Sequence, residues 1–367
     1  MKKITAIICE YNPLHNGHLY QLKETRKESD IIICVMSGNT VQRGGFAISD
    51  KYTRAKNAVE MGADIVVEHI FPHSMSSARD FAKSGIFIAN ALRANFLAFG
   101  HESDKEKLMK IANILSNPDV QEEITKLCIE KKNLSYPKAR EIFLSNLIGE
   151  DNAILLRKPN NILTVEYLMV LNSYKNISPL FIKRNNNFLS ATEIRKKIFS
   201  NSVIVEHIPT QTSDYLMENH IDLPILAILR SCNNYSEIYD CDYSLYCRII
   251  SESKKCLKLN DVISNCVSSA YTASKIRRCI YSIAFGTKPE AVKKNPKFTI
   301  LLAASERGIQ YLSEEKKQIG LPILTRMSDA KKNNIDVNQA LIPDTVYSLL
   351  VSKEFLPFQK PYLDIKN

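Results

Sequence analysis

The sequence predicts an α/β fold with a parallel sheet, followed by a mainly helical C-terminal domain. Over the first 205 residues, short β-branched apolar runs alternate with segments of helical length, which is typical of a parallel sheet with helical crossovers. Beyond about residue 205 this alternation is lost, and apolar residues recur at helical spacing. We therefore expect two domains, residues 1–205 and residues 206–367, which agrees with a length of 367 residues at roughly 150 residues per domain.

The expected elements of the first domain follow from these runs. Nearly continuous apolar segments suit strands covered on both faces, and the expected strands are Ile4–Cys9, Ile31–Met36, Ala63–Val67, Asn95–Phe99 and Ser178–Lys183. The expected helices are Gly17–Arg26, Asp50–Met61, Ser77–Leu92 and Ala191–Phe199. In the second domain, LPILAILRSC and ASKIRRCIYSIAFG have helical periodicity, and Leu321–Leu324 is a candidate strand.

Composition and charge narrow the class of protein. With 45% hydrophobic and 24% charged residues, the chain is globular, which excludes a disordered tail or a fibre. Forty-nine Lys and Arg against 39 Asp and Glu leave a net charge of +10, which attracts polyanions such as nucleic acid, nucleotides or acidic membranes. From Leu257 to the C-terminus there are 17 basic and 10 acidic residues, so +7 of the +10 lies in the last 111 residues.

The cysteines and the N-terminal sequence indicate the cellular compartment in which the protein is expected. Nine cysteines without a C-x-x-C pair argue against both a zinc knuckle and a disulfide framework, so we expect reduced thiols and assign no metal ligand. The first apolar run has only six residues before Glu10, too few for a signal peptide, and no run approaches 18 apolar residues. We expect a cytoplasmic protein that does not enter a membrane.

The motif EYNPLHNGH follows the first expected strand directly. Ligands of open parallel sheets bind beyond the carboxyl ends of the strands, and Gly17 permits a tight turn whose backbone N–H groups can meet an anion. His15 and His18 are three residues apart, so both imidazoles lie on nearly one face of a starting helix, where they can donate to phosphate oxygens. The alternatives are a buried histidine pair that satisfies turn carbonyls, or two metal ligands.

A second motif, SATEIR, opens the helix after the fifth expected strand. Ser190 or Thr192 can cap this helix while offering a hydroxyl to a phosphate, and Arg195 can bind phosphate oxygens with its forked guanidinium. Taken alone, the segment is an ordinary capping sequence. Together with the histidine motif it predicts phosphate chemistry, in which His15, His18, Thr192 and Arg195 are the candidate catalytic residues.

The two motifs together, H-x-G-H after the first strand and S-x-T-x-I-R later, resemble the nucleotidyltransferase superfamily. The segments EYNPLHNGHLYQL, SSARDFAKSGI, LAFGHESD, KPNNILTVEYL, SATEIR and YTASKIRRCIYSIAFG are similar to the bacterial tRNA(Met) cytidine acetate ligase family. This resemblance implies a Rossmann-like nucleotidyltransferase domain that uses ATP to activate acetate as acetyl-adenylate. We also expect a Mg²⁺ ion, which would neutralise the phosphate charge of ATP. The acetyl group would pass to N4 of the wobble cytidine of elongator tRNA(Met), giving N4-acetylcytidine.

The resemblance also implies the nucleotide-binding residues. The loop of the family carries over onto Ile8, Cys9, Glu10, Tyr11, Asn12, Pro13, Leu14, His15, Asn16, Gly17, His18, Leu19, Tyr20 and Gln21. Further ATP contacts are expected from Gly100, Asn161, Arg184 and Ser190, with Asn160 as the alternative to Asn161.

Basic residues supply the candidate tRNA contacts. The clusters SKIRR and KKNPK contain Lys275, Arg277, Arg278, Lys293 and Lys294, which can contact a phosphate backbone. Tyr271 and Tyr281 lie near enough in sequence to stack on bases. Lys51 and Arg54, at the start of an expected helix, are further candidates for phosphate or tRNA. The alternative for all of these cations is a solvated helix face.

Two departures from the family pattern fall beside the expected pocket. Gly45-Phe46 stands where Glu-Pro is expected, and His69-Ile70 stands where Leu-Pro is expected after Glu68.

Three other functions share part of the pattern: a small-molecule adenylyltransferase, a class I aminoacyl-tRNA synthetase, and a non-catalytic RNA-binding protein on the same scaffold. The synthetase is disfavoured because no K-M-S-K-S-type loop is present.

Overall fold

One sheet organises the computed structural model, which describes residues 2–131, 134–185, 187–200, 202, 206–209, 215–232, 235–356 and 358–364. Its strands are β1 (Ile4–Cys9), β2 (Ile31–Ser37), β3 (Ile65–His69), β4 (Phe96–His101), β5 (Ser178–Lys183), β6 (Thr299–Ser305), β7 (Ile323–Leu324) and β8 (Tyr362–Asp364). The order is β5-β4-β1-β2-β3-β6-β7, and β8 pairs with β6. The first five strands are parallel, which confirms the predicted α/β class.

The edge beyond β3 comes from the C-terminal part of the chain. β6 runs antiparallel to β3 and is itself parallel to β7 and β8. β6 was not predicted from the sequence, whereas the candidate strand Leu321–Leu324 contains β7. Residues on both sides of position 205 therefore build one sheet, and the division of the chain at that residue stays a prediction.

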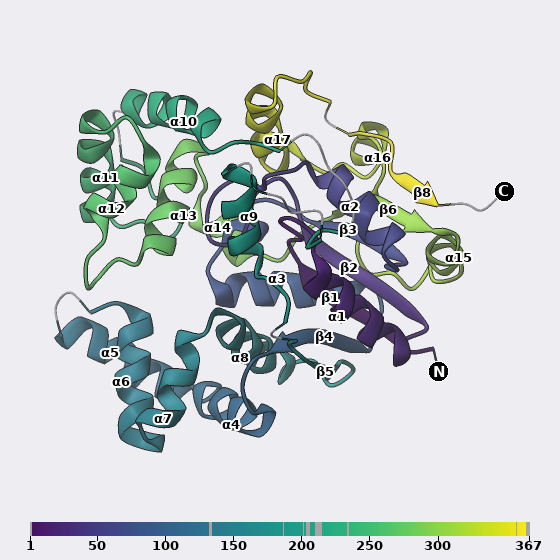
Figure 1. Cartoon of the computed structure of the whole chain (residues 1–367), viewed down its shortest axis with the longest axis horizontal. Helices are drawn as coiled ribbons and strands as arrows, with labels where there is room; N and C mark the ends of the chain where they lie inside the picture. The colour runs from purple at the N-terminus through teal and green to yellow at the C-terminus, as the bar shows by residue number, and fades with distance from the viewer. Residues whose placement is uncertain are drawn as a thin grey trace.

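Helices cover both faces of the sheet (Figure 1). In the first 200 residues they are α1 (Asn16–Lys27), α2 (Lys51–Glu60), α3 (Ala78–Ala91), α4 (Lys105–Leu115), α5 (Pro118–Glu130), α6 (Tyr136–Ile148), α7 (Glu150–Ala153), α8 (Pro159–Leu171) and α9 (Ala191–Phe199), with short 3₁₀ turns η1 (His73–Met75) and η2 (Ile154–Arg157). The later helices are α10 (Asn219–Ser231), α11 (Tyr243–Lys255), α12 (Leu259–Cys266), α13 (Ala273–Ala284), α14 (Pro289–Lys293), α15 (Glu306–Glu314), α16 (Met327–Lys332) and α17 (Asn338–Leu350).

The buried strands separate two hydrophobic cores because successive side chains of a strand point to opposite faces. In β2, Ile33 and Val35 face the core shared with α3 and α8, whereas Ile32 and Cys34 face the core shared with α1 and α2. A third core lies within α10–α13, and it also includes Phe46. The helical group is therefore anchored to the loop that follows β2.

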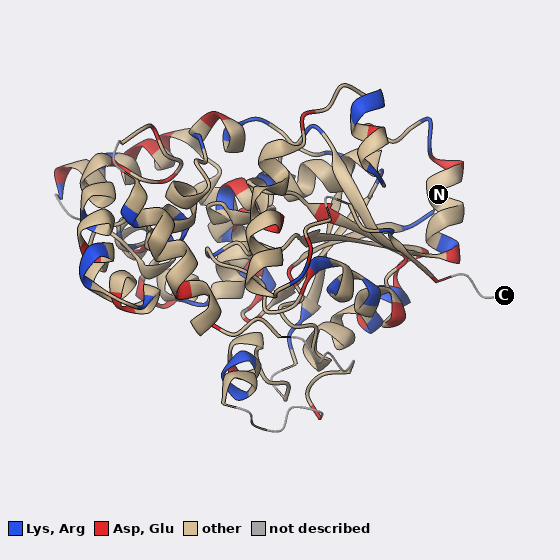
Figure 2. Cartoon of the chain, turned by 90° about the horizontal axis from the view of Figure 1, so that it is seen from above, with Lys and Arg blue, Asp and Glu red and all other residues tan. Residues whose placement is uncertain are grey.

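Acidic and basic residues are interspersed over the helices of the whole molecule (Figure 2). The surplus of positive charge is therefore not concentrated on a single helix or strand.

Among the residues that the structure describes, no helix is long and apolar enough to cross a membrane.

Candidate functional site

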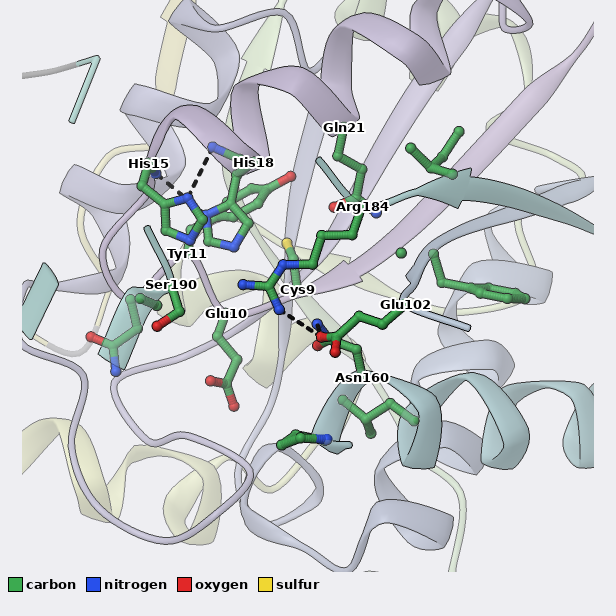
Figure 3. Close-up of a pocket in the computed structure, with 18 of the residues that line it drawn as sticks. Cys9, Glu10, Tyr11, His15, His18, Gln21, Glu102, Asn160, Arg184 and Ser190 are labelled. Carbon is green, nitrogen blue, oxygen red and sulfur yellow. Dashed lines mark hydrogen bonds and ion pairs between the residues drawn. The ribbon is translucent and has the colours of Figure 1, made fainter. Parts of the chain in front are cut away.

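A cleft of about 450 Å³ lies at the carboxyl ends of β1, β4 and β5. The start of α1, the first turns of α8 and α9, and the loop after β2 complete its walls (Figure 3). This is the edge at which parallel sheets bind ligands. The two predicted phosphate motifs, which are about 175 residues apart in sequence, meet there.

The two histidines of the first motif cap α1 and hold each other. His15 Nδ1 accepts the Gly17 N–H at 3.0 Å, and His18 Nδ1 accepts the His15 N–H at 3.3 Å. Their rings stack with centroids 3.7 Å apart. A Cβ atom on Gly17 would lie 2.8 Å from His15 Cε1, so the close cap requires glycine. Because each Nδ1 is an acceptor, the proton of each neutral ring lies on Nε2.

Both imidazoles are neutral at pH 7. Burial lowers the pKa of His15 to about 4, and the positive charges of Arg184 and Arg195 contribute to the shift. Burial also holds the pKa of His18 well below its usual value, with further contributions from His15 and Arg184. Each ring can therefore offer a neutral N–H group to a ligand, and the positive charge beside the rings is that of the neighbouring arginines.

The second motif forms the cap of α9 and reaches the first motif. Ser190 Oγ accepts the Glu193 N–H at 3.3 Å, and the Glu193 carboxylate accepts the Ser190 N–H at 2.7 Å. Arg195 donates to Thr192 Oγ1 at 3.1 Å and to the backbone oxygen of Asn12 at 2.7 Å. The predicted cap is confirmed, and Arg195 ties α9 to the histidine turn beside the cleft.

Arg184 faces the histidines from β5 (Figure 3). Its guanidinium lies 2.6 Å from a carboxylate oxygen of Glu102, which also accepts a hydrogen bond from Asn160 at 2.5 Å. Gly100 lines the same wall. Glu102 was not predicted as a site residue, although its position directly after β4 indicates a residue at this edge of the sheet.

The structure places Asn161, the predicted ATP contact, in the interior and not on the cleft wall. Asn161 is fully buried, and its side chain is bonded to Ser103 Oγ, the Leu155 oxygen and the Glu102 N–H. Asn160, the alternative, lines the cleft. Neighbouring residues of a helix point about 100° apart, so only one of the two can face the nucleotide.

The loop predicted from the resemblance lines the cleft over most of its length. From Ile8 to Gln21, the residues that do not line it are Pro13, Leu14, Asn16 and Leu19. Leu14 instead packs in the core beside α1. Gln42 and Arg43, on the loop after β2, also line the cleft and add polar groups that were not among the predicted site residues.

Lys51 and Arg54 are not surface contacts, so their predicted role in binding tRNA is wrong. Lys51 is 2% exposed, and its Nζ lies 2.7 Å from Glu68 Oε2 and 2.5 Å from Asp344 Oδ2. Arg54 is 1% exposed and donates to the backbone oxygens of Ser49, Glu10, Ser37 and Gly38. Both cations hold the strand ends together from inside the molecule.

The cations of α13 and the segment after it are more accessible. Lys275 is half-buried and lies 3.9 Å from Asp242, whereas Arg278 is 11% exposed and paired with Asp240 at 2.6 Å. Lys293 and Lys294 are exposed. Contact of these residues with tRNA stays a prediction.

The two departures from the family pattern have structural roles. Phe46 packs edge-on against Tyr281, with ring centroids 5.6 Å apart. Tyr281 is therefore buried in the helical core and is not available for base stacking. His69 is buried behind Phe81, a residue of the cleft wall, and its Nε2 is 2.8 Å from Ser84 Oγ.

Comparisons with known proteins agree with this geometry. The family model described as HIGH Nucleotidyl Transferase matches residues 1–359. The chain is 33% identical to a tRNA(Met) cytidine acetate ligase of Caldanaerobacter subterraneus subsp. tengcongensis, over 94% of each chain. It is 32% identical to the Lysinibacillus sphaericus relative of the same name, over 98% of this chain and 99% of that relative.

A solved structure matches over nearly the whole length. Thermotoga maritima TmcAL bound with alpha-thio ATP superposes with a TM-score of 0.88 at 28% identity, covering 99% of this chain and all of the neighbour. The apo form of the same protein gives the same TM-score and coverage. The chain therefore belongs to the tRNA(Met) cytidine acetate ligase family of HIGH nucleotidyltransferases.

Proposed function

We propose that the protein is an ATP-dependent acetate ligase that forms acetyl-adenylate and transfers the acetyl group to N4 of the wobble cytidine of elongator tRNA(Met), giving N4-acetylcytidine. The observation that carries this proposal is the meeting of two capped histidines with the start of α9 in one cleft. The family supports an ATP-dependent ligase, and its structural neighbour binds an ATP analogue. Acetate, the acetyl-adenylate and the nucleoside product are our proposal.

In the first proposed step, an acetate oxygen attacks the α phosphorus of ATP while the bond to the β phosphate breaks and pyrophosphate leaves. The Nε2–H groups of His15 and His18 donate to the phosphate oxygens as negative charge develops. Arg184 and Arg195 supply positive charge on either side. Donors that are already in place need little reorganisation during the reaction, so their position can supply much of the acceleration.

In the second proposed step, the N4 amine of cytidine attacks the acetyl carbonyl carbon. The bond between the acetyl carbon and the AMP oxygen breaks, AMP leaves, and the amine loses a proton. No covalent intermediate with the enzyme is required. A ligase that uses ATP and tRNA in this way would work in the cytoplasm, which is the compartment that we propose.

The cleft also has groups that fit a nucleotide-borne Mg²⁺ ion. Glu10 and Glu102 place carboxylates on its walls, and Mg²⁺ is commonly held by one or two carboxylates together with substrate phosphates. When bound, the ion would neutralise phosphate charge. The protein's own part is then to orient the triphosphate and to keep Arg184 next to Glu102.

The test of the first step is acetate-dependent exchange of pyrophosphate into ATP. His18→Ala should lose exchange by about two to three orders of magnitude, because one transition-state donor is removed. His220→Ala removes an exposed imidazole outside the cleft and serves as the matched control. Thermal unfolding of both variants shows whether the fold is kept. Full exchange in a folded His18→Ala protein would remove His18 from the chemistry.

The test of the second step is mass analysis of tRNA(Met) nucleosides after incubation with ATP and isotopically labelled acetate. Labelled acetylcytidine is the expected product. If none forms, exchange should be repeated with amino acids, nicotinate nucleotides and pantetheine phosphate in place of acetate. Exchange with one of these alone would make the protein a small-molecule adenylyltransferase or a synthetase instead. Absence of ATP binding would favour a non-catalytic RNA-binding protein.

A further inference from the structure

The loop after β2 carries an arginine to the mouth of the cleft on a fixed base. Within residues 40–46, which close in an isolated β-bridge, the Gln42 N–H donates to Glu10 Oε1 at 2.7 Å. The Gln42 side chain donates to the Ser76 oxygen at 2.8 Å. The next residue, Arg43, is exposed and lines the cleft. The backbone next to Arg43 is thus held, while its side chain is exposed.

The same loop is pressed against the basic helix α13. Gly44 has a φ of +86°, and a Cβ atom built on it would lie 2.6 Å from Arg278 N and 2.8 Å from Arg277 Cβ. Only glycine allows so close an approach of two backbones in this conformation. The contact places the base of Arg277 directly beside the loop that carries Arg43.

Arg277 and Arg43 lie at this seam, and neither is paired with a carboxylate of the described residues. Arg278 is engaged with Asp240 through two hydrogen bonds of 2.9 and 2.6 Å. Within the described part of the chain, neither Arg277 nor Arg43 forms an ion pair, and both retain exposed surface. A guanidinium group that has no ion pair can bind an anion without breaking an existing one.

The positive charge of both residues reaches the cleft. Burial lowers the pKa of Arg195, and the charges of Arg43 and Arg277 lower it further, against the opposing effect of Glu10 and Glu218. Like charges repel one another, and an anion between them offsets this repulsion. The seam between the cleft and α13 is therefore a favourable place for a phosphate.

We propose that Arg43 and Arg277 together bind one backbone phosphate of the tRNA at the mouth of the cleft, next to the nucleotide that is acetylated. This inference rests on the proposed function. Arg43 lines the cleft and Arg277 does not, so a ligand wholly inside the cleft meets only one of them. A strand that passes over α13 and inserts one base into the cleft meets both. A guanidinium pair suits phosphate because each can donate two parallel hydrogen bonds.

The experiment compares Arg43→Ala, Arg277→Ala and the double variant in two assays. The first is the dissociation constant of an unmodified tRNA(Met) transcript over a range of salt concentrations, and the second is acetate-dependent pyrophosphate exchange. Each single variant should weaken tRNA binding about five- to tenfold and lower the salt slope by about one. The fold loss of tRNA affinity should be at least five times the fold loss of the exchange rate. The double variant should lose less than the product of the single effects, because both residues hold the same phosphate.

Lys254→Ala is the matched control, since Lys254 is an exposed cation on α11 and lies outside the cleft lining. Unchanged tRNA affinity in both single variants would overturn the inference. Loss of exchange equal to the loss of binding would assign the arginines to ATP instead, and multiplicative effects would assign them to separate phosphates. Acetate-dependent exchange by the unmodified protein tests the proposed function independently. If that exchange is absent, the proposed function fails, and this outcome is distinct from unchanged tRNA affinity in the arginine variants.

Discussion

Helices α2 and α13 both begin with basic residues three positions apart, yet the two pairs have opposite surroundings. On α2, Lys51 and Arg54 are buried and fully engaged. On α13, Lys275 is half-buried and 3.9 Å from its nearest carboxylate, while Arg278 has one aspartate partner. The first pair holds strand ends together, and the second lies beside the mouth of the cleft.

The difference shows that the charge pattern of a helix does not decide whether its cations are available to a ligand. A buried charge is tolerated only when opposite charges or carbonyl groups surround it. For Lys51 these groups come from Glu68 on β3 and from Asp344 on α17, almost 300 residues further along the chain. Arg277 has no such partner among the described residues, so its guanidinium remains available to an external anion.

The largest expected effect is the loss of unfolding free energy when Lys51, one of the two buried cations of α2, is replaced. Lys51→Met removes the cation and leaves two carboxylates buried without it, which should cost about 3 to 5 kcal/mol of unfolding free energy. Urea unfolding followed by circular dichroism measures this. Lys254→Met, the same change at an exposed position of α11, should unfold like the unmodified protein. A stable Lys51→Met protein with weakened tRNA binding would contradict the structural role of Lys51.

The next effect concerns protonation in the cleft. Burial holds the pKa of His15 near 4, against an ordinary value of 6.5, so nuclear magnetic resonance of labelled histidine should show this ring neutral at pH 6. The proton should lie on Nε2. Because the folded pKa is the lower one, the neutral ring contributes stability above pH 6.5 that is lost as the pH falls toward about 4.

The variant Arg184→Ala tests the cause of the lowered pKa of His15. Removing its positive charge in Arg184→Ala should move the His15 midpoint upward, because Arg184 lowers the pKa of His15. Arg157→Ala removes an exposed arginine that is paired with Glu141 and does not line the cleft, so it should leave the midpoint in place. A His15 midpoint near 6.5 in the unmodified protein would show that the ring is not buried as described.

A smaller effect is expected at Arg278. Arg278→Ala breaks the pair with Asp240, and because both side chains are largely buried, we expect a loss of about 1 to 2 kcal/mol of unfolding free energy. A double-mutant cycle with Asp240→Asn isolates the pair. The effect on tRNA affinity should be smaller than that of Arg277→Ala. The reverse order would place Arg278, rather than Arg277, at the phosphate.

The smallest effect is expected at Lys275. Its 3.9 Å contact with Asp242 is partly exposed to solvent, and such ion pairs contribute about 0 to 1 kcal/mol. Lys275→Ala should therefore change the unfolding midpoint little, as thermal unfolding can show. A large destabilisation would mean that α13 resembles α2 after all, and the contrast between the two helices would disappear.

Local sequence was sufficient for much of the fold and for the chemistry of the cleft. Apolar runs predicted the bounds of β1 to β5 within two residues. For the buried strands β1–β4 the reason is that a strand covered on both faces carries few polar residues. The cap of α9 was predicted because capping joins residues two or three positions apart. The cap of α1 was not predicted: the Gly17 N–H, which was expected to meet an anion, donates to His15 Nδ1. β6 was missed because nothing in its own sequence indicates antiparallel pairing with a strand more than 200 residues earlier.

The sequence by itself determined the strand alternation, the histidine turn and the Ser190 cap, since each depends on neighbours within a few residues. The tertiary structure alone decided which of Asn160 and Asn161 faces the cleft, that Lys51 and Arg54 are buried, and that Gly44 brings α13 to the mouth of the site. These outcomes depend on contacts between segments far apart in the chain, where packing and charge compensation, rather than local pattern, set the environment of each side chain.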